Sequence, residues 1–326
     1  MFGYDTFHEN LMKNLIDSVH NGTSSHAYIF EGEKGLLKHS SARLFAAALS
    51  CQNRAVSPCG SCPCCVGAKA NTNPDIIYIE KSGDKKTIGV EPIRLLSEDV
   101  AVKPFYSKRK VYIINEGDIL TEDAQNAFLK TLEEPPDYAV FIIIVESSSV
   151  LLPTVLSRAE LIHFPPVSDK IIEQYIREKY PEQESRIPFL VKYCGGIPGN
   201  ADDIILDENF ETLREISLNM LPQLLSKNKI HAYSVQKFFD ENKEEAEKIV
   251  DFWLSFLRDT AVIQCGAKKN IINSDKEEKL NLLAGKYEAK RVVRAIDELI
   301  KAQKMMKRFV NLKALSLMTA LKVKER

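Results

Sequence analysis

Short apolar runs alternate with amphipathic stretches over the first half of the chain. Five runs have the length and the apolar character of buried strands, at residues 27–31, 75–80, 110–115, 139–145 and 161–164. Helix-like segments lie between them, and the clearest cover residues 38–50 and 121–132. This alternation predicts an α/β domain with a central parallel sheet. Pro165 and Pro166 should end the domain, because proline cannot continue a strand ladder.

The strand pattern disappears after residue 166. Residues 168–179 and 184–193 suit short helices, and a stretch rich in glycine at 195–199 breaks the chain before another helix begins. Farther along, apolar residues recur at intervals of three and four, as in Ile249, Phe252, Trp253, Phe256 and Leu257. The pattern predicts an α/β domain over 1–166, a small helical domain over 167–206 and an all-helical domain over 207–326.

The composition is that of an ordinary globular protein. The chain has 326 residues, 44% of them hydrophobic, and its 44 basic and 45 acidic residues give a formal net charge of −1. This charge creates no field that would draw the whole molecule onto DNA or an anionic membrane. The longest apolar run, Tyr138 to Val145, is too short to span a bilayer, and the first ten residues do not have the pattern of a signal peptide. We therefore expect a cytoplasmic protein with no membrane partner.

Two segments are locally basic. Residues 301–326 carry eight Lys or Arg and one Glu, and a charge run of this kind is usually the solvated surface of a helix. Residues 103–110 mix aromatic and basic side chains, which could contact nucleic acid. We interpret the second segment as a solvated turn before a strand, and leave direct DNA contact by the C-terminal helix open.

A loop after the first predicted strand has the context of a phosphate-binding loop but lacks two of its fixed residues. Gly32 and Lys38 occupy two of the four fixed positions of a Gly-x4-Gly-Lys-Ser/Thr motif, and Gly35 lies in the variable stretch between them. Leu37 replaces the last glycine, where a side chain limits backbone freedom and close approach to phosphate. His39 replaces the Ser/Thr whose hydroxyl would bind magnesium, and an imidazole is a poor ligand for a hard cation.

The second half of a nucleotide site is also altered. An Asp-Glu pair at the end of an apolar strand would hold magnesium and polarise water, but the strand at 110–115 ends in Asn115 and Glu116. The amide of Asn115 keeps the shape of the aspartate and loses its charge. Because Leu37, His39 and Asn115 each remove a separate interaction, we expect no functional ATP site.

Five of the seven cysteines lie between residues 51 and 65. Cys51, Cys59, Cys62 and Cys65 have the spacing C-x7-C-x2-C-x2-C, and four thiolates suit a closed, tetrahedral zinc site with a structural role. Cys64 makes the ligand set ambiguous, because it could replace Cys65 after a small shift of the backbone. The two remaining cysteines, Cys194 and Cys265, are predicted to be core thiols.

Four features together carry a family resemblance: Ser25 to Tyr28 leading into the altered loop, the cysteine cluster, Leu129 to Pro136 (LKTLEEPP) and Leu151 to Arg158 (LLPTVLSR). In order and spacing they resemble the delta-prime subunits of the bacterial DNA polymerase III clamp loader, which belong to the AAA+ class. The related gamma/tau ATPases share the last two features, but they have an intact phosphate loop and an Asp-Glu strand end.

The resemblance implies an AAA+ domain with a zinc-binding insertion at 51–65, a helical lid and a helical collar that holds the subunits in a ring. It also implies a stationary subunit that is no enzyme by itself and that acts only within the DNA-directed DNA polymerase holoenzyme. Its expected partners are the delta and gamma/tau subunits, and through the complex the sliding clamp and primer-template DNA.

The resemblance further assigns a role to Ser157 and Arg158. In the family a Ser-Arg-Cys motif supplies an arginine finger to the ATP bound by the next subunit, and in this chain Ala159 replaces the cysteine. The guanidinium is the chemically important group, because it binds phosphate oxygens and stabilises charge that develops during phosphoryl transfer. We therefore expect Arg158 to act in trans.

Two alternatives remain open at the level of sequence. The chain could be an active ATPase of the gamma/tau kind, if Lys38 and Glu116 were sufficient for nucleotide binding and turnover. It could also be a zinc-containing DNA-binding module with a vestigial AAA+ fold, in which case its isolated form would bind primed DNA in a salt-sensitive way.

Overall fold

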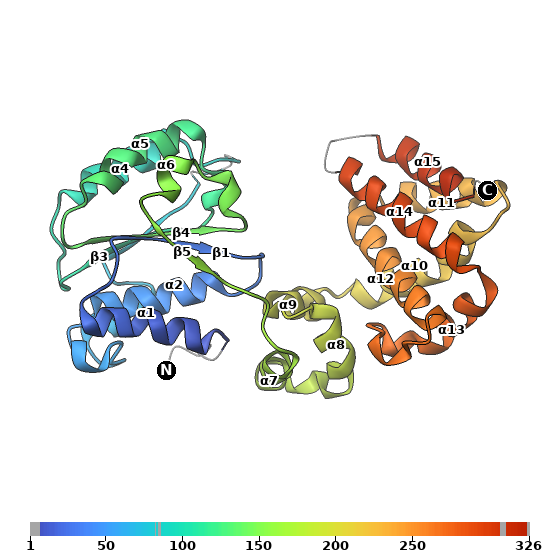
Figure 1. Ribbon diagram of the computed structural model, residues 1–326, viewed down its shortest axis with the longest axis horizontal. Coiled ribbons are helices and arrows are strands. Elements are labelled where there is room, and N and C mark those ends of the chain that lie inside the picture. The colour runs from blue at the N-terminus through green and yellow to red at the C-terminus, as the bar shows by residue number, and fades with distance from the viewer. Residues whose placement is uncertain (1–6, 82, 84–85, 307–310, 325–326) are drawn as a thin grey trace. The chain divides into compact units, whose positions relative to one another are not determined.

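The computed structural model describes residues 7–81, 83, 86–306 and 311–324. The chain forms two compact units (Figure 1). The first contains the residues up to 175 together with 196–200, and the second contains 176–195 and the residues from 201 onward. The division into three domains at 166 and 206 is a finer one and stays a prediction.

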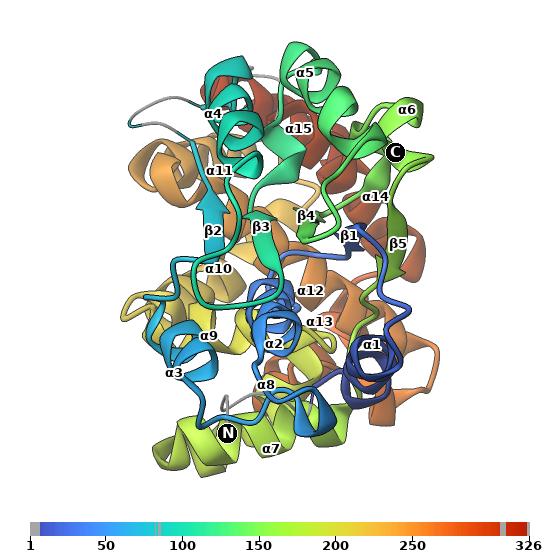
Figure 2. The same ribbon diagram turned by 90° about the vertical axis from the view of Figure 1, so that its left-hand side faces the viewer.

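A five-stranded parallel sheet lies at the centre of the first unit (Figure 2). Its strands are β1 (Ala27–Glu31), β2 (Ile76–Ile79), β3 (Lys110–Ile114), β4 (Ala139–Val145) and β5 (Glu160–His163). Their order is β2-β3-β4-β1-β5, and every neighbouring pair is parallel. The predicted α/β domain with a central parallel sheet is therefore confirmed, and each strand differs from its predicted range by at most one residue at either end.

Helices cover both faces of this sheet (Figure 1). Along β4, Val140, Ile142 and Ile144 pack on one side with α1 (Glu9–Asn21) and α2 (Lys38–Ser50). The alternate residues of the same strand pack on the other side with α4 (Val90–Val100), α5 (Glu122–Glu133) and α6 (Pro153–Leu156). A central strand buried on both faces must be apolar at every position, which explains the continuous run at 139–145.

The ends of α5 follow from local chemistry. At its start the hydroxyl of Thr121 accepts a hydrogen bond from the N–H of Ala124, and two acidic residues occupy the first turn, where the helix dipole favours them. At its end, Glu134 has left the helical conformation (φ −126°, ψ 60°) because the proline that follows disfavours it. The observed helix differs from the predicted 121–132 by one residue at each end.

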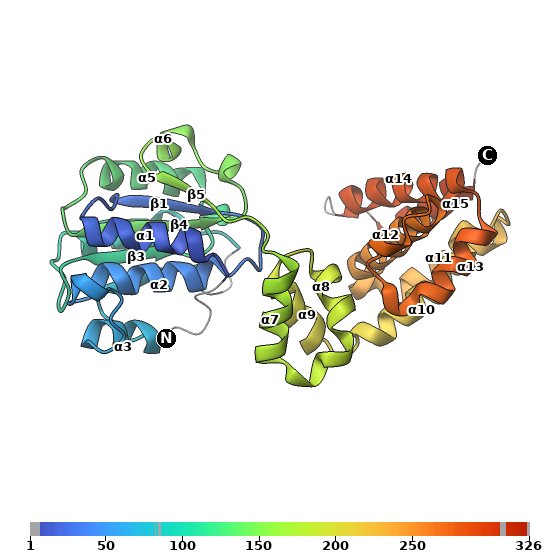
Figure 3. The same ribbon diagram turned by 60° about the horizontal axis from the view of Figure 1, so that its bottom comes forward.

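The second unit is helical, as predicted for the C-terminal part of the chain (Figure 3). Its helices are α8 (Ile187–Cys194), α10 (Phe210–Leu225), α11 (Ile230–Glu241), α12 (Ala246–Gln264), α13 (Glu277–Lys286), α14 (Ala289–Met306) and α15 (Leu312–Lys324). Two further helices, α7 (Asp169–Lys179) and α9 (Pro198–Leu206), contain residues of both units. The fully buried Arg214 lies over the ring of Phe189, 4.0 Å from its centroid, and its guanidinium is paired with Asp275.

Two lysines depart from the prediction of solvated basic segments. Lys324, near the end of α15, is buried and donates to the carbonyls of Gln223, Leu224 and Ser226 at the end of α10. Burial lowers the pKa of Lys324 to about 8. Lys110 is buried as well, and its ammonium lies 2.8 Å from a carboxylate oxygen of Asp99. Residues 307–310 and 325–326 of the predicted basic helix lie outside the described residues.

One core thiol was predicted correctly and one was not. Cys194 is buried in α8, whereas Cys265 is exposed. Cys265 directly follows the last residue of α12, which is where the chain leaves the packed helix.

None of the described helices combines the length and the apolar character that a membrane-spanning helix needs.

The loop before β3 is ordered by one buried carboxylate. Asp75 accepts hydrogen bonds from the backbone N–H groups of Phe105, Tyr106 and Ser107 and from the Ser107 hydroxyl. Burial alone would raise the pKa of Asp75, but these four donors together outweigh it and lower the pKa. The predicted solvated turn is thus a loop whose backbone is held by the buried Asp75, while the side chains of Phe105 and Tyr106 are exposed.

We expect Asp75→Asn to destabilise the first unit by about 2 kcal/mol at pH 7, because hydrogen bonds to a charged acceptor are lost. The pKa of Asp75 is lower in the folded state, so its contribution is complete above the unfolded value near 4 and is lost as the pH falls below it. Hydrogen exchange at the amides of 105–107 should therefore accelerate in the variant at pH 7, and the difference should shrink towards pH 3. Asp17→Asn, on the exposed side of α1, is the matched control, and equal exchange in all three proteins would contradict the assignment.

Candidate functional site

The carboxyl ends of β1, β3 and β4 border a cleft of about 440 Å³. Ligands of parallel sheets bind at this end of the strands. Residues 34–40 form one side of the cleft, and Asn115, Glu116, Asp118 and Glu146 line the other. The size of the cleft is within the range of small-molecule pockets, so its chemistry decides what it can bind.

The glycines of the loop are required by close backbone approach. A Cβ atom on Gly32 would lie 2.5 Å from the carbonyl oxygen of Phe164, and one on Gly35 would lie 2.8 Å from a methyl group of Ile197. Leu37 has a left-handed backbone (φ 58°, ψ 25°), which is the conformation that a glycine adopts most easily. Leu37 therefore holds the backbone conformation of a glycine at a cost in strain, and the expected limit on the approach of phosphate stays a prediction.

Lys38 is turned onto its own loop. Its ammonium donates hydrogen bonds to the carbonyl oxygens of Gly32 and, at 2.8 Å, of Glu33, and the side chain is buried. Burial lowers the pKa of Lys38, and the charges of Glu146, Asp118 and Glu33 oppose this effect in part. The cation that would bind phosphate in an intact loop is thus occupied by main-chain acceptors.

The two residues that replace the magnesium ligands bind each other. The Nδ1 atom of His39 lies 2.8 Å from Oδ1 of Asn115, and the amide nitrogen of Asn115 donates to Glu80 at 3.1 Å. His39 and Asn115 are 76 positions apart in the chain and lie together, as a shared site would require. Their side chains, however, bind each other. A hydroxyl and an aspartate at these positions would instead leave their oxygens for a cation.

Carboxylates lie along the same cleft. Glu116, Asp118 and Glu146 line it, and both carboxylate oxygens of Asp118 accept the N–H of Glu146 at 2.9 Å. Asp118 and Glu146 were not singled out in the sequence, although their positions just after two buried strands were a usable signal. Without a bound cation, these charges disfavour a triphosphate.

Arg158 follows the short helix α6. Its Nη1 atom donates to the carbonyl of Thr154 at 2.7 Å and to the hydroxyl of Ser157 at 3.1 Å, and its Nη2 atom lies 2.6 Å from Oε1 of Glu133. About a third of its side chain is exposed. Ser157 and Arg158 are thus in contact, and Glu133 is a partner that the sequence did not identify as functional.

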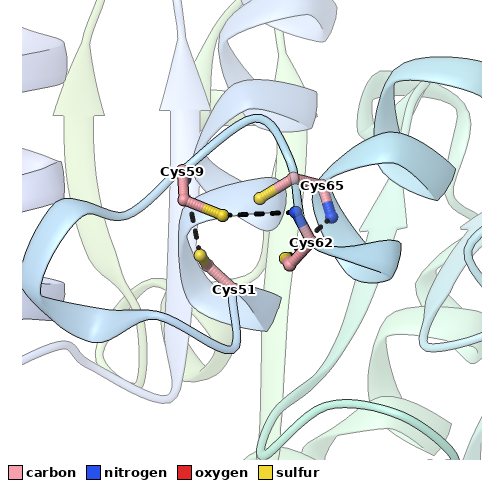
Figure 4. Close-up of side chains that lie close together, drawn as sticks. All are labelled: Cys51, Cys59, Cys62 and Cys65. Atoms are coloured by element: carbon pink, nitrogen blue, oxygen red, sulfur yellow. Dashed lines mark hydrogen bonds between the residues drawn. The ribbon is translucent and has the colours of Figure 1, made fainter.

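The four cysteines with zinc-type spacing lie close together, three of them in the segment between α2 and α3 (Pro63–Ala70) and Cys65 in the first turn of α3 (Figure 4). Their four Sγ atoms are within 4.8 Å of one another. Four sulfurs at about 2.3 Å from a zinc ion are separated by about 3.8 Å, so small side-chain movements would complete the tetrahedron. Cys65 is a member of the group, and Cys64 is not.

Backbone N–H groups point at the sulfurs of this cluster. The N–H of Cys62 donates to Cys59 and that of Cys65 donates to Cys62, both at 3.4 Å. Such donors stabilise thiolates, and the N–H groups of Ser61 and Cys62 lower the pKa of Cys59 to about 6. Burial raises the pKa of Cys51 and, to about 11, that of Cys64. The donor set fits a structural zinc ion, which would bind all four thiolates and leave no position for water.

Two family models and several relatives match the chain. One family model, described as DNA polymerase III, delta subunit, matches residues 7–168, and a second, described as DNA polymerase III, delta subunit, C terminal, matches residues 208–322. The chain is 29% identical over 312 residues to the DNA polymerase III subunit delta' of Bacillus subtilis, covering 94% of this chain and 92% of that one. It is 32% identical over 221 residues to a gamma/tau subunit of Mycoplasma pneumoniae, of which it spans only about a third (32%).

Solved structures were compared as well. A gamma subunit-related protein of Thermotoga maritima is 18% identical, with coverage of 97% of this chain and 99% of that one and a TM-score of 0.47. The clamp loader delta protein of Bacillus subtilis is 14% identical, with coverage of 97% and 100% and a TM-score of 0.34.

The parallel sheet with helices on both faces, the loop at the end of its first strand and the helical C-terminal part are consistent with the AAA+ architecture that the sequence resemblance implied. The two family models together match most of the chain. The chain belongs to the DNA polymerase III delta-prime family, which confirms the resemblance seen in the sequence.

Proposed function

We propose that this chain is a non-hydrolysing stator of the clamp loader, which helps to place the sliding clamp on primed DNA during replication. One observation carries the proposal: the side chains of the cleft that would bind phosphate and magnesium are bound to other groups of the chain. Lys38 is bound to loop carbonyls, and His39 is bound to Asn115. To bind ATP and magnesium, the protein would have to break both contacts and would gain no carboxylate at position 115 in return.

The same proposal assigns Arg158 to the ATP site of a neighbouring gamma/tau subunit. Its guanidinium is partly exposed and carries a permanent charge. In phosphoryl transfer such a group stabilises the charge that develops on the equatorial oxygens, and in trans it is worth about 10³ to 10⁵ in rate. The Ala159 that follows it has no polar side chain, so the finger chemistry rests on Arg158, with Ser157 as a hydrogen-bond acceptor.

Partners follow from the family. We propose that the chain assembles in the cytoplasm with delta and gamma/tau subunits, and reaches the clamp and the primer-template DNA through the complex. It would then have no enzymatic activity of its own and would serve DNA polymerase III as a structural and regulatory subunit. The C-terminal helical part is the proposed collar, and residues 167–206 are the proposed lid.

We further propose that Cys51, Cys59, Cys62 and Cys65 bind one structural zinc ion. The proximity of the four sulfurs and the N–H donors around them support this assignment. The ion would cross-link the segment between α2 and α3, where the regular structure is short. The sheet has a large apolar core on both faces, so the rest of the unit does not depend on the metal.

We expect no micromolar binding of ATP to the isolated chain, because the loop lysine is bound to main-chain carbonyls and Asn115 replaces the aspartate that would bind magnesium. Equilibrium dialysis with labelled ATP and magnesium measures this, and a gamma/tau subunit serves as the positive control. Saturable micromolar binding would favour the alternative of an active ATPase.

Arg158→Ala should leave assembly unchanged and should lower the DNA-stimulated ATPase rate of the reconstituted complex by about 10³-fold at the site that this chain completes. Arg158→Lys keeps the charge but loses the planar fork, so its rate should also fall. Arg54→Ala, which removes an exposed arginine of the same unit, is the control. Wild-type rates in the Arg158 variants would exclude the finger.

Zinc analysis of the purified chain should give one ion per molecule. Cys59→Ser should lose it, whereas Cys64→Ser should keep it, because Cys64 lies outside the cluster. Chelation should accelerate hydrogen exchange in residues 51–65 and leave the strands protected. Unfolding of the whole sheet on removal of zinc would show that the metal is required for the fold.

A further inference from the structure

The guanidinium of Arg158 is held from two sides by the first unit. Thr154 and Ser157, in the turn that precedes it, bind Nη1, and Glu133, at the end of α5, binds Nη2. A flexible arginine has many rotamers in solution, so contacts to both terminal nitrogens restrict the position and the plane of the fork.

Helix stability does not explain why a glutamate occupies position 133. It is the last residue of α5, and a carboxylate at the carboxyl end of a helix interacts unfavourably with the helix dipole. About half of its side chain is exposed, and exposed ion pairs contribute little to stability. The Arg158 contact therefore suggests a role in orientation more than a role in folding.

The segment that carries Arg158 is fixed to α5 at a second point. The amide of the buried Gln125 donates to the carbonyl of Val150 at 3.2 Å and accepts the N–H of Leu152 at 2.7 Å. Leu132 of α5 and Val155 of α6 are both almost fully buried in the same apolar core. Glu133 thus reaches Arg158 from a rigid neighbour, as a positioning residue should.

We infer that Glu133 is a positioning residue for Arg158: its carboxylate holds the guanidinium in the orientation in which it enters the neighbouring ATP site. This inference rests on the proposed function of Arg158. A catalytic group that is held in its reactive orientation before the reaction gives a higher rate, and a misplacement of about 1 Å can lower the rate by a large factor. Glu133 acts through Arg158 and does not itself contact the nucleotide.

The test uses the complete clamp loader, reconstituted with delta and gamma/tau subunits, the sliding clamp and primed DNA. Glu133→Gln keeps the shape of the side chain and removes its charge. We expect its kcat for DNA-stimulated ATP hydrolysis to fall about tenfold, with KM for ATP and the native mass of the complex unchanged. Glu134→Gln removes the charge of the next, exposed residue and should have the wild-type rate.

A double-variant comparison separates positioning from a general structural effect. If Glu133 acts through Arg158, the variant that combines Arg158→Ala with Glu133→Gln should be no slower than Arg158→Ala alone. A further loss in the double variant would overturn the inference, and so would a wild-type or faster rate for Glu133→Gln beside an inactive Arg158→Ala. If Arg158→Ala itself has the wild-type rate, the finger and its positioning residue both fail.

Discussion

The central constraint in this protein is the satisfaction of polar groups at the carboxyl ends of the parallel strands. Backbone and side-chain groups meet there, and in this chain they bind one another: Lys38 binds loop carbonyls and His39 binds Asn115. A buried ammonium needs acceptors whether or not a ligand is present. In this chain the loop carbonyls supply the acceptors for Lys38.

The hydrogen bonds of Lys38 and His39 within the cleft agree with the proposed role of a subunit that does not hydrolyse ATP. A subunit that does not cycle between nucleotide states can remain in one conformation, and its contribution to its neighbours is then geometric. The α5 helix illustrates this, because its apolar face packs in the core while Gln125 and Glu133 bind the segment that ends in Arg158. The first unit thus presents a charged group on a rigid frame.

The cysteine cluster is a separate, local site in the first unit. Four thiols and the N–H groups that surround them form a local site in a segment with little regular structure. The site lies outside the strand-end cleft and shares no lining residue with it. A metal bound there would stabilise the segment of residues 51–65 and would leave the chemistry of Arg158 unaffected.

The sequence by itself determined the sheet, the helical C-terminal part and the family, because strand and helix periods, prolines and motif spacing are local signals. It also singled out the altered loop and Arg158, whose roles stay predictions. Only the tertiary structure decided that His39 binds Asn115, that Glu133 binds Arg158, that Asp75 anchors residues 105–107 and that Lys324 is buried. Each of these joins positions far apart in the chain, and no local pattern records which polar groups will meet once the core has packed. The left-handed backbone of Leu37 is a local exception, because the turn between β1 and α2 overrides the preference of its side chain.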